Sequence, residues 1–459
     1  LIINQFAHVY ATYYDADFKE TVEHIESAKS KLAYIEVKAK EKGYPLYLII
    51  DEYDNFTNVI LSEHGQRMFH DLTHASGFYR EYFKQFKGMF DRIFMMGVSP
   101  VTLDGLSSGY NIDWNISVDE IFNAMMGFEE AEVREMFRYY QQNDMLKGDV
   151  EAMITEMKPW YDNYCFARMS LNDDRVFNCD MTLYYLNYQV QRGSSPEEMV
   201  DKNIRTDYSK LKMLARIDRD SVQEGDRMST IEKIAAEGDI FVDLHTSFPA
   251  ERITDIDNFR SLLYYYGLLT MCGTRGDLIK MSIPNNCVRE QYFGFLRDYY
   301  QKYSSIDLHY LNVMLTDMAY DGRWKPFFES VAQAYRENSA VRDAMEGERN
   351  LQGFLKAYLA LASYYLVEPE LEMNYGYCDF FLLPDKKRYP DVKHSYILEL
   401  KYATRTATDA ELEVQALEGR KQLLRYSEDK IVRCLSEGTT LHRLLLQFRG
   451  WDLVRCEEV

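Results

Sequence analysis

Two short apolar runs joined by a charged turn, Tyr377–Pro384 (YCDFFLLP) and Ser395–Lys401 (SYILELK), decide the fold of the C-terminal part of this chain. Each run has the length of a β-strand, and the residues between them are rich in Pro, Asp and Lys, which predicts a β-hairpin. Side chains alternate along a strand, so Glu399 and Lys401 point to one face. Asp379 opens the partner strand, and the hairpin is expected to bring its carboxylate next to Glu399.

Two carboxylates and an ammonium group at one edge of a sheet suit phosphodiester hydrolysis. Carboxylate oxygens bind Mg²⁺, which lowers the pKa of its bound water and neutralises charge that grows on the phosphate. The lysine has three available roles: to orient the water, to help deprotonate it, or to stabilise the phosphorane. Glu and Lys on one strand face are more often a solvated surface, so this strand alone is a weak signal.

The order of these residues resembles the PD-(D/E)xK nuclease superfamily. Asp379 carries the signature, followed about twenty residues later by Glu399-Leu400-Lys401. The resemblance implies a restriction-endonuclease-like α/β domain that cuts DNA. It implies that Asp379, Glu399 and the Leu400 carbonyl bind Mg²⁺ or Mn²⁺, with Lys401 at the attacking water.

Three further positions extend the resemblance. Gln422 and Tyr426 are four residues apart, which places them on one helix face, and they match the Gln-x-x-x-Tyr element of one superfamily branch. Glu348 begins a helical pattern and resembles the first acidic position. The proline of the name is absent, because Cys378 precedes Asp379, as in many members. The implied catalytic set is Asp379, Glu399, Lys401, Glu348, Gln422 and Tyr426.

The N-terminal part predicts a different module. Residues 1–42 have the apolar spacing of a helical segment. The apolar run Leu46–Ile50 then leads directly into Asp51-Glu52, as in the Walker B strand of P-loop ATPases. In such a strand, which is buried in a parallel sheet, the Asp holds Mg²⁺ and the Glu polarises the attacking water. Arg92–Ser99 is expected to be the next buried strand, with Ser99 near a sensor position.

These segments resemble the AAA-ATPase-like domain that precedes PD-(D/E)xK nuclease domains in many bacterial proteins. The resemblance implies that Asp51, Glu52 and Ser99 bind the nucleotide and its metal. Two positions depart from the family, which usually has Gly and Arg where Asn163 and Cys165 stand. The matching segments cover nearly the whole chain and continue through residues 108–111, 127–133, 160–166, 259–270 and 283–285.

One departure concerns ATP itself. The sequence contains no Gly-x-x-x-x-Gly-Lys-Ser/Thr loop, which cradles the phosphates and supplies the key lysine. In this family the loop lies before the Asp-Glu strand, and the chain begins at Leu1 rather than Met, so we expect a missing N-terminal piece. ATP binding is expected only if that piece supplies the loop, and ATPase activity is not expected of the given sequence.

Length and composition predict a mixed α/β protein of several domains. The 459 residues, 46% of them hydrophobic, suffice for sizeable cores. We expect an ATPase-like domain over residues 1–165, its mainly helical continuation over 166–340, and a nuclease-like domain over 341–459. Phe354–Val367 is expected to be one buried helix. No apolar run reaches the length of a membrane span, and the seven scattered cysteines suggest a reducing, cytoplasmic location.

Charge does not predict tight binding of nucleic acid. The net charge is −20, but residues 341–459 hold 17 Lys and Arg against 20 Asp and Glu, a net of −3. Phosphate contacts require Lys and Arg. The cluster Lys386, Lys387, Arg388 and Lys393 flanks the predicted hairpin and offers a local basic rim for DNA.

Two other motifs have simpler explanations. Gly105–Gly109 satisfies Gly-x-Ser-x-Gly, but a hydrolase elbow needs a strand before it and a helix after it, which this context lacks. A Gly- and Ser-rich loop is the favoured interpretation. His70 and His74 are four residues apart on a helical segment, but no third metal ligand is evident.

Two functional classes remain open. The first is a Mg²⁺-dependent nuclease linked to an ATPase-like module, which the set Asp379, Glu399 and Lys401 favours. The second is a regulatory or interaction protein with a degenerate nuclease fold, which the acidic charge and the absent phosphate loop favour. Assembly into a homo-oligomer is expected by analogy alone.

Overall fold

The computed structural model describes residues 5, 8–9, 16–54, 86, 89–102, 114–173, 175–201, 208–216, 224–249, 252–253, 255–301, 306–337, 347–361, 364–373 and 376–459. The chain separates into two compact units. The first unit comprises Leu1–Asn115 with His245–Tyr266, and the second comprises Ile116–Leu244 with Gly267–Val459. The described residues confirm a mixed α/β protein.

The first unit contains a parallel strand pair. Strand β1 (Tyr47–Ile50) pairs in parallel with β2 (Arg92–Met95), as the two apolar runs predict. The expectation of a buried strand is wrong for β1, because every second side chain faces solvent and Ile49 is 70% exposed. Besides this pair, the first unit has α2 (Ala16–His24), α3 (Ala28–Lys42), β3 (Val101–Thr102), β7 (Phe248–Pro249) and α14 (Ile256–Tyr265).

Residues 1–42 do not form one continuous helical segment. Helix α2 ends at His24, and α3 begins after Ser27, whose hydroxyl accepts a hydrogen bond from the Ser30 amide at 3.0 Å. This N-cap satisfies a backbone donor that the first helical turn leaves unpaired. The apolar spacing that continues through Ile25 therefore crosses the boundary between two helices.

The second unit begins with a helical region that also contains strands. Its helices are η2 (Glu120–Phe122), α8 (Glu130–Gln142), α9 (Val150–Tyr161), η3 (Arg168–Ser170), α10 (Cys179–Arg192), α12 (Tyr208–Arg216), α13 (Glu224–Glu237), α15 (Asn286–Gln301), α16 (Leu308–Asp321) and α17 (Lys325–Glu337). Short strands β4 (Phe128–Glu129) and β5 (Val176–Phe177) pair, and β6 (Asp239–Val242), β8 (Thr270–Arg275) and β9 (Leu278–Ser282) form a sheet of order β6-β9-β8. Gly273 lies in β8 at an irregular register.

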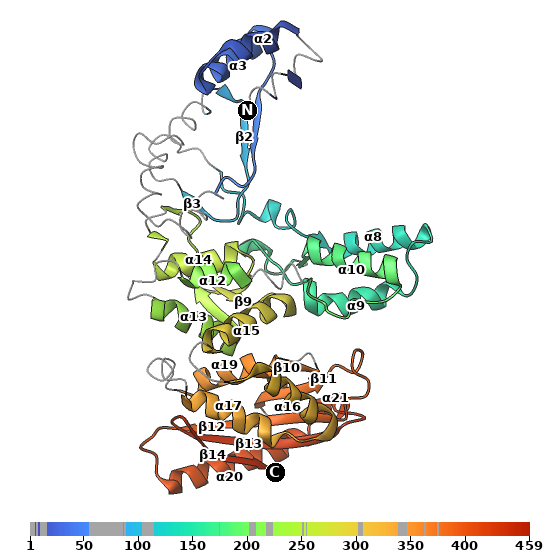
Figure 1. Ribbon diagram of the computed structural model, residues 1–459, viewed down its shortest axis with the longest axis vertical. Helices are drawn as coiled ribbons and strands as arrows, with labels where there is room; N and C mark the ends of the chain where they lie inside the picture. The colour runs from blue at the N-terminus through green and yellow to red at the C-terminus, as the bar shows by residue number, and fades with distance from the viewer. Residues whose placement is uncertain are drawn as a thin grey trace. The chain divides into compact units, whose positions relative to one another are not determined.

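The C-terminal part is a five-stranded sheet of order β10-β11-β12-β13-β14 (Figure 1). Strands β12 and β13 are parallel and are joined through helix α20, whereas the other neighbours are antiparallel. Helix α20 packs on one face of the sheet and α16, α17 and α19 on the other (Figure 1). The elements are α19 (Glu348–Leu359), β10 (Tyr365–Met373), β11 (Gly376–Pro384), β12 (His394–Ala403), α20 (Asp409–Ser427), α21 (Lys430–Leu435), β13 (Thr440–Arg449) and β14 (Asp452–Glu458).

The structure bears out the predicted hairpin and adds two strands. Phe354–Val367 is not one helix, because α19 ends at Leu359 and β10 begins at Tyr365. The run is largely apolar because most residues of the helix and the first residue of the strand, Tyr365, are buried. Strand β14 closes the sheet beyond β13, although its alternation of apolar and polar residues is too irregular to predict it.

The loop after α9 joins three parts of the second unit. Asn163 has a φ of +85°, and its side-chain amide donates to the Pro284 carbonyl at 2.8 Å. The Asn285 amide donates to the Asp162 carbonyl at 3.0 Å, which fixes the start of α15 beside the same loop. A residue with positive φ is normally Gly, and Asn is tolerated next best.

We predict that Asn163→Ala lowers the free energy of unfolding by about 1 to 3 kcal/mol, because it combines left-handed backbone strain with a lost hydrogen bond. Asn163→Gly should cost clearly less, because glycine adopts positive φ freely. Denaturant unfolding followed by tryptophan fluorescence measures both. An equal loss in the two variants would show that the backbone conformation is not the constraint.

A buried glutamate makes stability depend on pH. Glu232 on α13 is 5% exposed and accepts a hydrogen bond from the Tyr300 hydroxyl at 3.1 Å. Burial raises the pKa of Glu232 from 4.5 to about 7, although the Tyr300 bond lowers it. The folded state therefore binds more protons than the unfolded state between pH 4.5 and 7, and stability falls as pH rises through this window.

We predict that Glu232→Gln removes this loss and increases the free energy of unfolding at pH 8 by about 1 to 3 kcal/mol. The amide oxygen can still accept the Tyr300 hydroxyl. Denaturant unfolding at pH 5 and pH 8 gives the comparison, with Glu135→Gln on the exposed face of α8 as control. If the free energy of unfolding changes equally with pH in both variants, groups other than Glu232 cause the pH dependence of stability.

Candidate active site

The site lies where strands β11 and β12 separate. Their ladder contains only the pairs Phe380↔Leu398, Phe381↔Ile397 and Leu382↔Tyr396. One position further along, the Leu400 amide donates to the Asp379 carboxylate, with a distance of 2.7 Å from N to Oδ2. A side-chain oxygen thus replaces the strand partner of a backbone N–H group, which needs a partner wherever it is buried.

The second oxygen of Asp379 is held from a helix. Gln352 on α19 donates from Nε2 to Asp379 Oδ1 at 3.1 Å. The sequence analysis missed Gln352, although a signal was available. It lies four residues after Glu348, so the two side chains share one helix face.

Glu399 is buried. It is 3% exposed, and its Oε1 accepts from Lys401 Nζ at 2.8 Å. Its other oxygen, Oε2, is buried and has no hydrogen-bond partner among the described residues. Burial and the nearby charge of Asp379 raise the pKa of Glu399 from 4.5 to about 7, against the opposing effect of Lys401.

Lys401 is held as a cation. Burial lowers the pKa of its ammonium group, but the charge and hydrogen bond of Glu399 outweigh burial. The charges of Asp379 and Glu348 act in the same direction, so the pKa is raised overall. A lysine that stays protonated stabilises negative charge but cannot take a proton from water.

Helix α20 covers this face of the sheet. Burial raises the pKa of Tyr426 to about 12, and the charges of Glu399 and Asp379 add to the shift, whereas a hydrogen bond from Gln422 opposes it. Tyr426 therefore lies near the charges of both carboxylates, and Gln422 lies beside Tyr426. The Gln422 Oε1 atom is buried without a hydrogen-bond partner in the described part of the chain.

Gly419 lets α20 approach the strand. A Cβ atom at this position would lie 2.7 Å from Leu445 Cδ1, 3.4 Å from Lys401 Cε and 3.6 Å from Glu399 Cγ. The sequence analysis did not single out Gly419. Its only signal is helical spacing, three and seven residues before Gln422 and Tyr426.

The donor atoms suit a hard divalent cation. Asp379 and Glu399 supply carboxylate oxygens, and the unpartnered Glu399 Oε2 lacks a positive or N–H group. Mg²⁺ is often bound by only one or two carboxylates, with water and substrate oxygens as its other ligands. Glu348 is exposed at the start of α19, and the described residues contain no group of three His, Cys, Asp or Glu placed to hold a metal.

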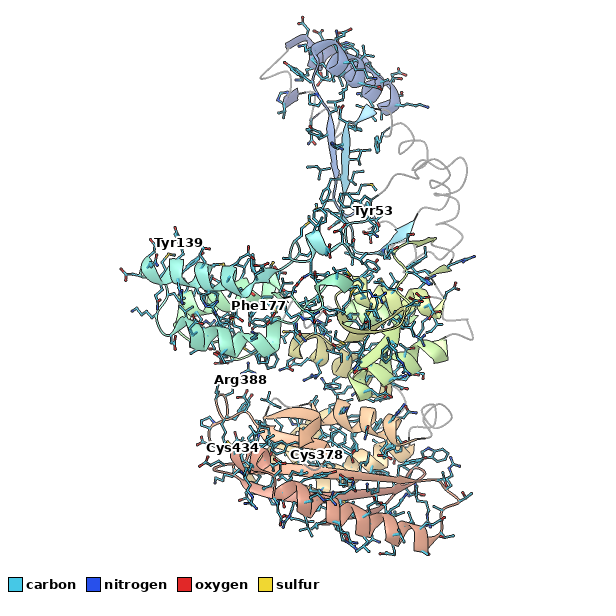
Figure 2. The ribbon with its side chains drawn as sticks, turned by 180° about the vertical axis from the view of Figure 1, so that it is seen from behind. Tyr53, Tyr139, Phe177, Cys378, Arg388 and Cys434 are labelled. Carbon is cyan, nitrogen blue, oxygen red and sulfur yellow. The ribbon has the colours of Figure 1, made fainter. Side chains whose placement is uncertain are left out.

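The basic residues of the hairpin do not line this site. Lys393 precedes β12 and lies six residues from Glu399, which is about 20 Å along a strand. Lys386 donates to the Val392 carbonyl, and Arg388 stacks 4.9 Å from the Trp160 ring on α9 (Figure 2). Arg388 also contacts Asp385. Lys387 and Lys393 are exposed at this far end of the hairpin, so the expected basic rim is remote from the carboxylates.

In the first unit, the predicted nucleotide residues lie at the carboxyl ends of β1 and β2. Asp51 and Glu52 are exposed, whereas Ser99 is buried and its hydroxyl has no partner among the described residues. The sequence analysis missed Asp54, whose carboxylate accepts from the Ser99 amide at 2.6 Å and from the Val98 amide at 3.1 Å. Asp54 therefore ties the two strand ends together. His70, His74 and the Gly105–Gly109 motif lie outside the described residues.

Two family models match the N-terminal and C-terminal parts of the chain. Residues 346–458 match the family model of the PD-(D/E)XK nuclease superfamily, and residues 2–107 match a model described as a predicted AAA-ATPase. These matches confirm both resemblances, and the C-terminal sheet fits a restriction-endonuclease-like domain. No curated protein and no solved structure matched the chain. None of the described helices has the length and apolar character needed to cross a bilayer.

We predict that Gly419→Val destabilises the C-terminal sheet by about 1 to 3 kcal/mol, because the added methyl groups collide with Leu445 and displace α20. Thermal unfolding measures the loss. Gly353→Ala is the control, since the new Cβ on α19 would meet its neighbours at an ordinary 3.5 Å. If Gly419→Val proves as stable as this control, α20 is not packed against the strand through Gly419.

Proposed function

We propose that this chain is a Mg²⁺-dependent nuclease that hydrolyses phosphodiester bonds of DNA at Asp379, Glu399 and Lys401. The observation that carries the proposal is the unpartnered, buried Glu399 Oε2 beside Asp379, because a buried carboxylate oxygen without a donor is costly unless a cation binds it. The match of residues 346–458 to a nuclease superfamily supports the same reaction class.

The three residues have different proposed roles, which follow from their environments. Asp379 and Glu399 would hold the cation, with the Leu400 carbonyl as the third protein ligand that the resemblance implies. When bound, Mg²⁺ would supply Lewis acidity toward a phosphate oxygen and lower the pKa of water. Lys401, kept protonated by Glu399, stabilises the charge that develops on the phosphorane.

Two residues of α20 are proposed to act beside the carboxylates. The Tyr426 hydroxyl stays protonated at neutral pH, since burial and the two carboxylates raise its pKa to about 12. It can therefore donate a hydrogen bond to a phosphate oxygen or to the attacking water. Gln422, hydrogen-bonded to Tyr426, orients that hydroxyl, and α20 excludes bulk water from Glu399.

The N-terminal module is proposed to be linked to the nuclease as an ATPase-like domain. Asp51, Glu52 and Ser99 remain its predicted nucleotide residues, placed at the ends of two parallel strands. Such strand ends are where ligands bind in open α/β sheets. ATP binding by this module depends on a phosphate-binding loop that the sequence lacks.

We predict that the protein cleaves DNA in the presence of Mg²⁺ or Mn²⁺, and that Asp379→Ala and Lys401→Ala each lower the rate at least about 100-fold. Assays on single- and double-stranded DNA and on RNA, with EDTA as a blank, define the substrate. Lys421→Ala, an exposed lysine on α20, is the control and should retain the wild-type rate.

Two outcomes would contradict the proposal. Cleavage that persists in folded Asp379→Ala would place the activity elsewhere, for example in a contaminating nuclease. A folded wild type that binds Mn²⁺ but cuts none of these nucleic acids would favour an interaction protein with a degenerate nuclease fold.

A further inference from the structure

The Asp379 carboxylate depends on helix α19 for its orientation. Its Oδ2 is fixed by the Leu400 amide within the sheet, and its Oδ1 is bound by Gln352 from α19. Rotation of the carboxylate would break both bonds. The position of α19 relative to β11 therefore sets the direction of the lone pairs that remain for a cation.

Helix α19 is packed closely against α13 of the upstream helical region. A Cβ atom on Gly353 would lie 3.5 Å from both the Ala236 Cβ and the Glu232 carbonyl, so the two helices approach without room for a larger side chain. Lys356 is 2% exposed and donates from Nζ to the Ala236 carbonyl. A buried ammonium bound to the last turn of α13 joins the two helices by a charge-assisted bond.

Two arginines fix the ends of α19. Arg349 forms an ion pair with Glu237 at the end of α13, with 2.8 Å between Nη1 and Oε1. Arg297 on α15 donates to the Ala357 and Ala360 carbonyls at 2.8 and 3.0 Å, which satisfies acceptors at the C-terminal end of α19. Between them, the rings of Tyr300 and Phe354 lie 4.9 Å apart.

Gln352 and Gly353 are adjacent residues with different neighbours. The side chain of Gln352 contacts Asp379, whereas the backbone at Gly353 contacts α13. Any shift of α13 that moves α19 would therefore move Gln352 away from Asp379. Residues that hydrogen-bond to a metal-binding carboxylate, as Gln352 does to Asp379, strongly affect the affinity for the metal.

We propose that Gln352 is a positioning residue of the metal site, and that helices α13 and α15 fix it there through α19, so that the upstream helical region controls the metal affinity of the nuclease-like domain. This inference rests on the proposed function, because it requires that Asp379 and Glu399 bind a divalent cation. It assigns the regulation of that site to the packing of α13 on α19.

The first test is Gln352→Leu in the full chain. We expect Mn²⁺ binding, measured by electron paramagnetic resonance, to weaken about 10- to 100-fold. The thermal unfolding midpoint of the metal-free protein should change little, since leucine retains most of the side-chain volume. Gln333→Leu is the matched control, because Gln333 on α17 also donates to a carboxylate, Glu337, but at an exposed position.

The second test leaves every residue near the carboxylates intact. Gly353→Leu places a wedge between α19 and α13, and we expect Mn²⁺ binding to weaken at least about 10-fold, whereas Gly353→Ala should bind as the wild type does. Circular dichroism of both variants reports whether α19 and the sheet remain folded.

The outcomes separate the inference from the function on which it rests. Wild-type Mn²⁺ affinity in a folded Gln352→Leu variant, or in a folded Gly353→Leu variant, would overturn the inference alone, provided that Asp379→Asn and Glu399→Gln abolish binding. If those two carboxylate variants bind Mn²⁺ as tightly as the wild type does, Asp379 and Glu399 do not form the metal site. Weakened binding in both the Gln352 and the Gly353→Leu variants, with both controls normal, would support the coupling.

Discussion

The hydrogen bond from the Leu400 amide to Asp379 is the interaction on which the candidate site depends. A sheet gains stability by pairing every backbone group, yet here the β11–β12 ladder stops after three pairs and a carboxylate replaces the next partner. The ladder therefore ends beside Glu399. Because an unpaired buried N–H group is costly, the Asp379 side chain is what stabilises this end of the ladder.

Burial gives the site its electrostatic character. Glu399 and Lys401 lie beneath α20, where water is largely excluded and charges interact over longer distances than at the surface. In this setting the pKa values of both groups are raised: burial and the charge of Asp379 raise that of Glu399, whereas the charge and hydrogen bond of Glu399 outweigh burial at Lys401. Gly419 permits this arrangement, since any side chain there would separate the helix from the strand.

The charges of the C-terminal part are largely used within the fold. Arg420 and Arg455 both bind Glu457, and Arg449 binds Asp409. Arg388 stacks on Trp160, so a residue of the hairpin loop connects the sheet to the helical region. A surface whose cations are paired in this way is not built for tight, unspecific binding of phosphate backbones, in keeping with the near-neutral charge of residues 341–459.

The sequence by itself determined the local elements and the chemistry that each one carries. Two short apolar runs joined by a charged turn predicted the β11–β12 hairpin, and four-residue spacing predicted that Gln422 and Tyr426 share a face of α20. An apolar run ending in Asp-Glu predicted a strand parallel to the next. Such patterns extend over only a few residues, so they can be recognised without tertiary information. The same locality explains the failure at Phe354–Val367, where one apolar pattern runs through two elements.

Only the tertiary structure decided which side chains meet. Gln352 reaches Asp379 across 27 positions of sequence, and Gly419 meets Leu445 because α20 crosses from β12 to the parallel β13. The basic residues that flank the hairpin are close to Asp379 and Glu399 in sequence, but an extended strand carries them away from the site. The physical reason is that spacing along one element fixes the direction of a side chain, whereas its neighbours depend on how separate elements pack.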